Sequence, residues 1–312
     1  MNRTILIALT AFLSLGIAAC DDGPSDTAEP SDSDAAELDA EAEEPRGTLT
    51  FAFQPQENPD GLALDTERFA EFIGQQTGFE VEIFLPTNYS AVVEALRSDN
   101  ADVAYFSGLP YMMAHKMADA ELLVVEEREG NPFYYSQWYT LKDSGIDDLS
   151  DLEGRSIAFT SPTSTSGYLF PLAEVIDQGL LDKKGDPRDF FGDVVFAGGY
   201  QQALLSLVNG RVDAAAASDY SLQQYLSDDE RDNIKVITEQ GPVPTHGLAV
   251  RGGLDDEVVE DIRQALLMLN EEEYSDLLES VYGAEKLVVQ DHDTHVDALQ
   301  HAYELVDFDE DI

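Results

Sequence analysis

The chain has 312 residues, of which 63 are acidic and 17 basic, and its formal net charge is −46. This charge excludes nucleic acid as a partner, because nucleic-acid binding depends on neutralising phosphates with lysine and arginine. Acids spread along the whole chain are typical of a protein that stays soluble in high salt, where surface charges are screened within a few ångströms. The composition therefore predicts a salt-adapted surface.

The first twenty residues predict an export signal. Arg3 supplies a positive charge, and residues 5–15 form an apolar run that is too short for an ordinary spanning helix. Ala18 and Ala19 precede Cys20, a pattern that resembles the bacterial lipobox, in which the thiol is lipidated and becomes the mature N-terminus. An ordinary cleavage site beside a chance cysteine is the alternative. Cys20 is the only cysteine, so the chain can form no internal disulfide.

Residues 21–46 are rich in acids and poor in apolar side chains, with Arg46 as their only base. Such a segment cannot bury enough apolar surface to fold, so we expect a disordered tether. It would hold a globular part, residues 47–312, away from a membrane surface.

The globular part alternates strand-like and helix-like segments, which predicts an α/β fold with parallel sheets and connecting helices. Two stretches, 93–104 and 204–215, share one pattern of amphipathic helix end, turn, aspartate and small apolar strand, which suggests two similar lobes. Strands are expected at residues 49–54, 80–85, 103–106, 122–125, 156–159 and 193–196, and helices at 65–77, 91–97, 168–178, 201–208 and 221–226.

Two further segments predict crossings between the lobes: the aromatic run 133–141 and the run 243–250, which is entered through two prolines. Two crossings make the first lobe discontinuous. We therefore expect lobe 1 over residues 47–138 and 246–312 and lobe 2 over residues 139–245, with a ligand cleft between them.

The turn at residues 160–167 reads Thr-Ser-Pro-Thr-Ser-Thr-Ser-Gly and lies between an expected strand and an expected helix. Free backbone N–H groups at a helix start, together with the helix dipole, favour an anion. One hydroxyl suffices to cap a helix, so several in succession favour ligand contact over capping alone. Neutral donors of this kind can bind an oxyanion without any nearby positive charge.

Ordered motifs along residues 48–270 resemble the substrate-binding proteins of phosphonate, phosphite and phosphate ABC importers. The motifs are Asn58-Pro59, the runs 88–96 and 102–106, Tyr135-Ser136, the run 164–169 with Pro171, Phe190-Phe191, Gly198-Gly199, the run 212–216 and Pro242-Val243-Pro244. The resemblance implies a two-lobed type II periplasmic-binding-protein fold that closes over an oxyanion.

The resemblance also implies the site residues. By position in the motifs, the anion would be held by Ser164, Thr165 and Ser166 of the hydroxyl turn, with Tyr89 and Tyr135 as further donors. No cofactor and no metal is expected.

Other polar residues are weaker candidates for the site. Where the family often reads Gly-Gly-Ser-His-Asp, this chain has Gln201 in place of the histidine, a neutral donor and acceptor. Asp219 follows a strand and would accept a hydrogen bond from a protonated anion or pair with a ligand amine, unless it only caps a helix. His246 is either a site residue or a hinge residue. The segment 291–295, Asp-His-Asp-Thr-His, lacks a recognised metal-ligand spacing.

These expectations converge on a lipid-anchored, monomeric binding protein outside the cytoplasm. It would capture a phosphorus oxyanion and deliver it to an ABC permease whose ATPase is a separate chain, because the sequence has no phosphate-binding loop of the GxxxxGK[ST] type. An alternative is a receptor that presents the anion to a membrane kinase. A hydrolase is disfavoured, since no Gly-x-Ser-x-Gly elbow is present.

Overall fold

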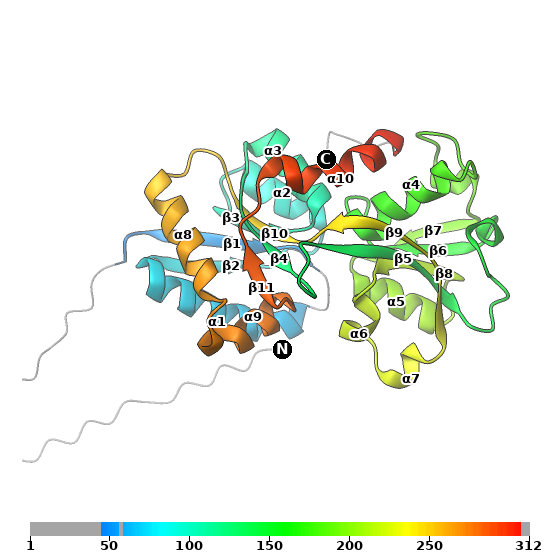
Figure 1. Cartoon of the computed structure of the whole chain (residues 1–312), viewed down its shortest axis with the longest axis horizontal. Coiled ribbons are helices and arrows are strands. Elements are labelled where there is room, and N and C mark those ends of the chain that lie inside the picture. The colour runs from blue at the N-terminus through cyan, green and yellow to red at the C-terminus, as the bar shows by residue number, and fades with distance from the viewer. Residues whose placement is uncertain (1–44, 56–58, 307–312) are drawn as a thin grey trace, which may run out of the picture. The chain divides into compact units, whose positions relative to one another are not determined.

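The computed structural model describes residues 45–55 and 59–306, which form a mixed α/β fold with two sheets (Figure 1). The expected export signal, Cys20 and the tether up to residue 44 lie outside the described residues, as does Asn58. None of the helices in the described part of the chain is long and apolar enough to span a bilayer.

The first sheet has six strands in the order β11-β4-β10-β3-β1-β2. They are β1 (Thr48–Phe53), β2 (Glu80–Phe84), β3 (Val103–Phe106), β4 (Glu121–Glu127), β10 (Gly247–Val250) and β11 (Lys286–Val288). The helices that pack with it are α1 (Pro59–Thr77), α2 (Tyr89–Arg97), α3 (Gly108–Ala118), α8 (Asp256–Met268) and α9 (Ser275–Tyr282).

The second sheet has five strands in the order β7-β6-β8-β5-β9. They are β5 (Phe133–Leu141), β6 (Ser156–Phe159), β7 (Asp193–Phe196), β8 (Ala214–Ser218) and β9 (Ile234–Pro244). The associated helices are α4 (Phe170–Asp177), α5 (Tyr200–Val208), α6 (Ser221–Tyr225) and the single turn α7 (Asp228–Arg231). β8 is buried along its whole length, which explains its run of four alanines inside this sheet.

The prediction of parallel sheets is only half right. β1 runs parallel to β2 and β3, and β6 runs parallel to β7 and β8. In contrast, β10 is antiparallel to β3 and β4, and β5 is antiparallel to β8 and β9. The chain leaves the first sheet through β4 and β5 and returns through β9 and β10, so the outgoing and returning strands pair antiparallel and need no helical crossover.

Strand pairing places the first crossing earlier than residue 138. Phe133 lies opposite Pro244, and Ser136 lies opposite Ser218, so all of β5 belongs to the second sheet. The chain therefore changes sheet within residues 128–132. The return crossing falls at residues 245–246, between β9 and β10.

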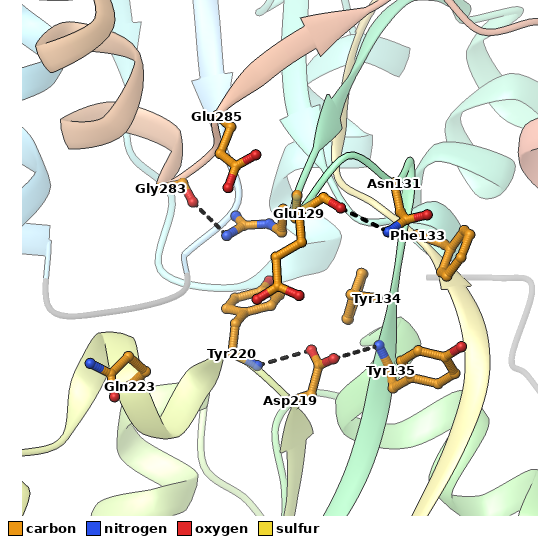
Figure 2. Close-up of a pocket in the computed structure, with 11 residues that line it drawn as sticks. Glu129, Asn131, Phe133, Tyr134, Tyr135, Asp219, Tyr220, Gln223, Gly283 and Glu285 are labelled. Atoms are coloured by element: carbon orange, nitrogen blue, oxygen red, sulfur yellow. Dashed lines mark hydrogen bonds between the residues drawn. The ribbon is translucent and has the colours of Figure 1, made fainter.

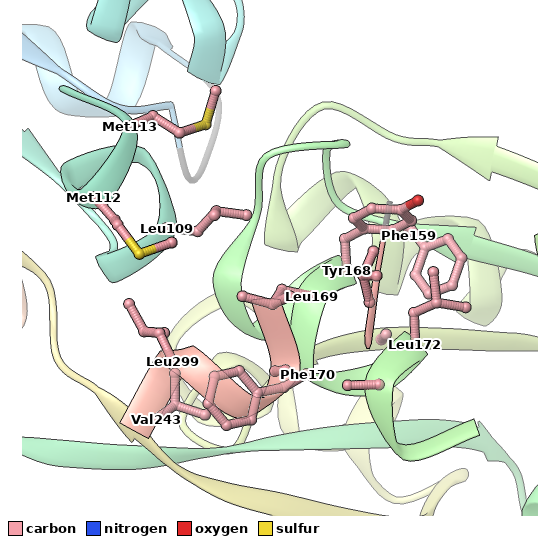
Figure 3. Packing of buried hydrophobic residues seen from close by; sticks show 14 of the residues in the cluster. Leu109, Met112, Met113, Phe159, Tyr168, Leu169, Phe170, Leu172, Val243 and Leu299 are labelled. Carbon is pink, nitrogen blue, oxygen red and sulfur yellow. The ribbon is translucent and has the colours of Figure 1, made fainter. Parts of the chain in front are cut away.

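The last helix, α10 (His292–Leu305), contacts elements of both sheets. It packs against α3 beside the first sheet and against α4 and β9 of the second, and the red helix lies by both groups of elements in Figure 1. One buried apolar cluster contains Leu299 of α10, Leu109 and Met112 of α3, Leu169 just before α4, and Phe170, the first residue of α4 (Figure 3). This cluster supports the segment that begins α4.

Candidate functional site

The hydroxyl-rich turn after β6 is buried and leads into a turn of π-helix, η2 (Thr165–Leu169), which continues as α4. Thr160 N–H donates to the carbonyl of Gly167 at 3.0 Å, and Gly167 N–H donates to Ser164 Oγ at 3.1 Å. A Cβ on Gly167 would lie 2.0 Å from Thr160 Oγ1, so only glycine permits this approach. Hydrogen bonds at Thr160 and Gly167 thus close the turn.

Ser164, Thr165 and Ser166 are fully buried, and each has a different neighbour. Ser164 is the N-cap of η2. Thr165 Oγ1 accepts a hydrogen bond from the backbone N–H of Leu109 in α3 at 2.8 Å, which joins the turn to the first sheet's side of the fold. Ser166 Oγ lies 3.1 Å from the Tyr134 hydroxyl and 2.7 Å from the Tyr200 hydroxyl. The three residues therefore lie where both halves of the fold meet.

Tyr89 is the first residue of α2, directly after the N-cap Asn88. Its side chain is fully buried and its hydroxyl has no hydrogen-bond partner among the described residues. Ser164 and Gln54 lie near this hydroxyl and lower its pKa, although neither makes a hydrogen bond to it with ordinary distance and angles. Burial, and then the neighbouring Tyr200 and Tyr225, raise the pKa of Tyr89, so the hydroxyl stays protonated and can donate.

Gln54, at the end of β1, is a further polar residue of this site that the sequence analysis missed. Its Oε1 accepts from Ser107 N–H at 3.1 Å, which points its amide group inward. Its Nε2 is buried and finds no acceptor within the described chain. Two unpaired donors, Tyr89 Oη and Gln54 Nε2, thus lie near the serine turn. Buried polar groups are rarely left unpaired, so these atoms indicate a place for an acceptor.

The structure brings Tyr134 to the serine turn, not Tyr135. Successive side chains of β5 point to opposite faces. Tyr134 and Ser136 are buried and both bond to Ser166, the latter by donating from its Oγ to the Ser166 carbonyl at 2.7 Å. Tyr135 is half-buried and contacts Phe133 on the other face. Tyr135 instead lines the cavity beside Asp219, and its role as a donor to the ligand stays a prediction.

At the start of α5, the structure places Tyr200 rather than Gln201 against the turn. Tyr200 is fully buried and its hydroxyl reaches Ser166, whereas Gln201 is half-buried one position later. Adjacent residues of a helix point in directions about 100° apart, so the two side chains have different surroundings, and a role of Gln201 in ligand binding stays a prediction. The sequence alone does not distinguish Tyr200 from a core residue, because an aromatic ring is equally typical of a core position.

Asp219 follows β8 and lines a cavity of about 420 Å³ with Tyr134, Tyr135 and Tyr220 (Figure 2). Its two carboxylate oxygens accept the backbone N–H groups of Tyr135 at 3.1 Å and of Tyr220 at 2.9 Å. Burial raises the pKa of Asp219, although these two hydrogen bonds oppose the rise. The carboxylate therefore organises the backbone beside the cavity.

A buried ion pair borders the same cavity. Arg128 Nε donates to Glu126 Oε2 at 2.9 Å, and the guanidinium lies 4.1 Å from the centre of the Tyr220 ring. Tyr105 donates from its hydroxyl to the other oxygen of Glu126. Arg128 comes from the end of β4, and Tyr220 follows β8, so this contact links the two sheets.

The Asp-His-Asp-Thr-His segment forms the start of α10. Asp291 is the N-cap and accepts from Thr294 N–H at 3.0 Å, while the His292 ring packs 3.9 Å from the His115 ring. Within the described ranges no three histidine, cysteine or acidic side chains are grouped so that they could hold a metal ion.

The comparisons with known proteins agree with this architecture. Residues 51–295 match the family described as "ABC transporter, phosphonate, periplasmic substrate-binding protein". The chain is 29% identical over 226 residues to the phosphate-import protein PhnD of Mycolicibacterium smegmatis, covering 69% of this chain and 70% of the relative. It is 25% identical over 224 residues to the phosphonates-binding periplasmic protein of Escherichia coli, covering 70% of this chain and 64% of that relative.

Two solved structures confirm the fold. A binding protein component of an ABC phosphonate transporter from Pseudomonas aeruginosa superposes with a TM-score of 0.73 at 24% identity, covering 80% of this chain and 84% of that one. PhnD1 of Prochlorococcus marinus, solved in complex with methylphosphonate, has a TM-score of 0.72 at 17% identity, covering 83% and 98%. The predicted two-lobed type II fold is thereby confirmed. The chain belongs to the family of periplasmic substrate-binding proteins of phosphonate ABC transporters, a family of binding proteins rather than enzymes.

Proposed function

We propose that this protein captures a small phosphorus oxyanion and delivers it to an ABC permease. The observation that carries the proposal is the set of unpaired buried donors, Tyr89 Oη and Gln54 Nε2, near the serine turn. Ser164, Thr165 and Ser166 would supply hydroxyl and backbone donors on the other side of the anion. Neutral donors in a closed site bind an anion through oriented dipoles, so the acidic surface does not prevent binding.

The names of the relatives support a phosphorus ligand without choosing among its forms. One relative is a phosphate-import protein, another a phosphonates-binding protein, and a third, 27% identical over 170 residues, a probable phosphite-binding protein. We therefore keep phosphate, phosphite and phosphonate as the ligand class. The kinase-linked sensor has no comparable support, because the family that matches the chain is a transporter family.

A thermal-shift series tests the ligand class. The protein would be heated in 1 M KCl with phosphate, phosphite, methylphosphonate or 2-aminoethylphosphonate. A ligand at one hundred times its dissociation constant adds about 2.7 kcal/mol to stability, so at least one of them should raise the melting temperature clearly. A Tyr89→Phe variant should lose much of that shift, whereas Ser280→Ala on the exposed face of α9 should keep it. A series with no shift would rule out the phosphorus ligand.

We also propose that Cys20 carries a lipid anchor and that residues 21–46 tether the binding domain to the membrane. Expressed in a bacterial host that processes lipoproteins, the wild type should sediment with membranes. Cys20→Ser should move the protein to the soluble fraction, and Ser25→Ala in the tether should not. Membrane association that persists in Cys20→Ser would disprove the anchor.

A further inference from the structure

His246 is a buried residue on the return crossing between β9 and β10, and the proposed function gives it no role. Its ring is fully buried and stacked between the Tyr105 ring, 5.5 Å away, and the Tyr134 ring, 5.9 Å away. The Tyr200 ring meets it edge-on at 6.4 Å. The imidazole therefore contacts two tyrosines, Tyr134 and Tyr200, whose hydroxyls both bond to Ser166 of the serine turn.

The two ring nitrogens of His246 have different surroundings. Nδ1 lies 3.4 Å from the Tyr220 hydroxyl and 3.9 Å from Glu126 Oε2. Nε2 is buried and has no hydrogen-bond partner among the residues that the structure describes. A buried nitrogen without a partner costs about 1–3 kcal/mol, so a partner in the ligand-bound protein would recover that free energy.

The Glu126 carboxylate favours one of the two neutral tautomers of His246. Glu126 is fully buried and held by Arg128 and Tyr105, and it faces Nδ1. A carboxylate on this side favours the tautomer with the proton on Nδ1. Burial, with Arg128 and His295 as further causes, lowers the pKa of His246, so a second proton is not added at neutral pH. Nε2 is therefore the nitrogen of the buried ring that can accept a hydrogen bond.

Two acidic groups near His246 are already engaged, whereas Glu129 and Glu285 also line the cavity. Glu126 is paired with Arg128, and both oxygens of Asp219 accept backbone N–H groups. A hydroxyl hydrogen on a bound anion would meet the unpaired Nε2 of His246 rather than the carboxylate of Glu126 or Asp219. The serine turn supplies donors, and His246 supplies a complementary acceptor.

We propose that His246 contacts the ligand and selects protonated phosphorus oxyanions, with Nε2 accepting a hydrogen bond from a P–OH group. Phosphate keeps such a hydroxyl at neutral pH, and so does the monoanion of methylphosphonate. Sulfate has the same size and tetrahedral shape but no proton to donate at this pH. The inference rests on the proposed function and adds to it the chemical property by which the site distinguishes similar anions.

Calorimetry with phosphate, methylphosphonate and sulfate tests the role of His246 at pH 7 in 1 M potassium chloride. The wild type should bind phosphate at least about 100-fold more tightly than sulfate, since an unpaired acceptor costs a few kcal/mol. His246→Phe should weaken phosphate binding about 10- to 100-fold and leave sulfate binding unchanged, so the preference shrinks. His246→Gln keeps a hydrogen-bond acceptor and should perturb folding less than His246→Phe. It should retain most of the preference for phosphate over sulfate.

His301→Gln is the control, because His301 lies exposed on α10, where its Nε2 meets the Asp177 carboxylate. Its ratio of phosphate to sulfate affinity should equal that of the wild type. Equal wild-type affinities for phosphate and sulfate would overturn the role of His246. So would an unchanged phosphate affinity in a folded His246→Phe. If no phosphorus oxyanion binds even the wild type, the proposed function itself fails, which is a different result.

Discussion

At the scale of single residues, the proposed site offers an anion hydroxyl and amide groups rather than positive charges. Ser164, Thr165, Ser166 and Tyr89 are all buried, and none is charged. Arg128, which lines the cavity beside the site, is paired with Glu126 and so is not free to meet an anion. Preorganised neutral donors avoid the cost of burying an unpaired cation and need no help from a surface of net charge −46.

The two adjacent tyrosines of β5 give a direct test of this arrangement. Tyr134→Phe removes a hydroxyl that donates to Ser166, so oxyanion binding should weaken about 10-fold, as expected for loss of one buried hydrogen bond. Tyr135→Phe changes a half-buried ring on the opposite face and should alter affinity less than about 3-fold. Calorimetry with the ligand found by thermal shift would measure both. A larger loss in Tyr135→Phe would restore the assignment that the motif predicts.

At the scale of elements, the decisive unit is β6, the hydroxyl turn, η2 and α4. The turn brings its own backbone to within bonding distance at Gly167, and the apolar cluster of α3, α4 and α10 holds the helix that follows. A helix start fixed in this way keeps its N–H groups in place before the ligand arrives.

Substitution of Gly167 should disrupt this turn. In Gly167→Ala the new Cβ would overlap Thr160 Oγ1 and Cβ, at 2.0 and 2.4 Å, so the turn must shift. We expect a loss of about 2–4 kcal/mol in the free energy of unfolding together with loss of ligand binding. Gly179→Ala is the control: its φ is +72° but nothing lies within 4 Å, so it should cost only about 1 kcal/mol. Equal losses in both variants, measured by urea unfolding, would contradict the clash.

Helix α10 should make stability depend on pH through His295. Burial, and then His292, lower the pKa of His295 to about 4, whereas an unfolded histidine titrates near 6.5. Below pH 6.5 the unfolded chain therefore takes up a proton that the folded protein does not. The contribution to stability is complete above about pH 6.5, falls as the pH drops towards 4, and is constant below that.

Urea unfolding at pH 7.5 and pH 5.0 would measure this effect. The wild type should lose about 2 kcal/mol more between these two values than His295→Gln, because one group changes its proton uptake over about 1.5 pH units. Because His295 is itself one cause of the low pKa of His246, the same comparison in a His246→Gln background isolates the contribution of His295. An identical loss in wild type and variant would show that His295 does not titrate as the structure implies.

At the scale of the whole molecule, charge repulsion is the main feature. Acids outnumber bases by 63 to 17, and the ion pairs of the described residues are mostly exposed pairs of small energetic value. The remaining acids repel one another across the surface. Salt shortens the range of that repulsion from about 10 Å at 0.1 M to about 3 Å at 1 M.

The melting temperature should therefore rise with salt. Between 0.1 and 1 M KCl we expect an increase of at least about 5 °C, which for a domain of this size corresponds to about 2 kcal/mol. Sucrose at equal osmolality, which stabilises by exclusion but screens no charge, is the control and should raise the temperature less. A melting temperature that is independent of KCl would argue against a salt-adapted surface.

Much of the fold could be predicted because local patterns already contain it. The strands at 103–106, 133–141, 156–159 and 193–196 have the expected bounds, and the family motifs lie on the turns that surround the site. These elements follow from hydrophobic periodicity and turn chemistry, which act between residues close in sequence. The antiparallel pairing of the crossing strands was missed because it joins segments about a hundred residues apart, and no local pattern encodes it.

The sequence by itself determined the charge, the alternation of strands and helices, the hydroxyl turn and the family. Each of these depends on composition or on neighbours along the chain. Only the tertiary structure decided which side chains bond to the turn, namely Tyr134 and Tyr200, and which buried atoms have no partner among the described residues, such as Nε2 of His246. The physical reason is that one residue of shift reverses the face of a strand, and only packing between the two sheets determines which face is buried.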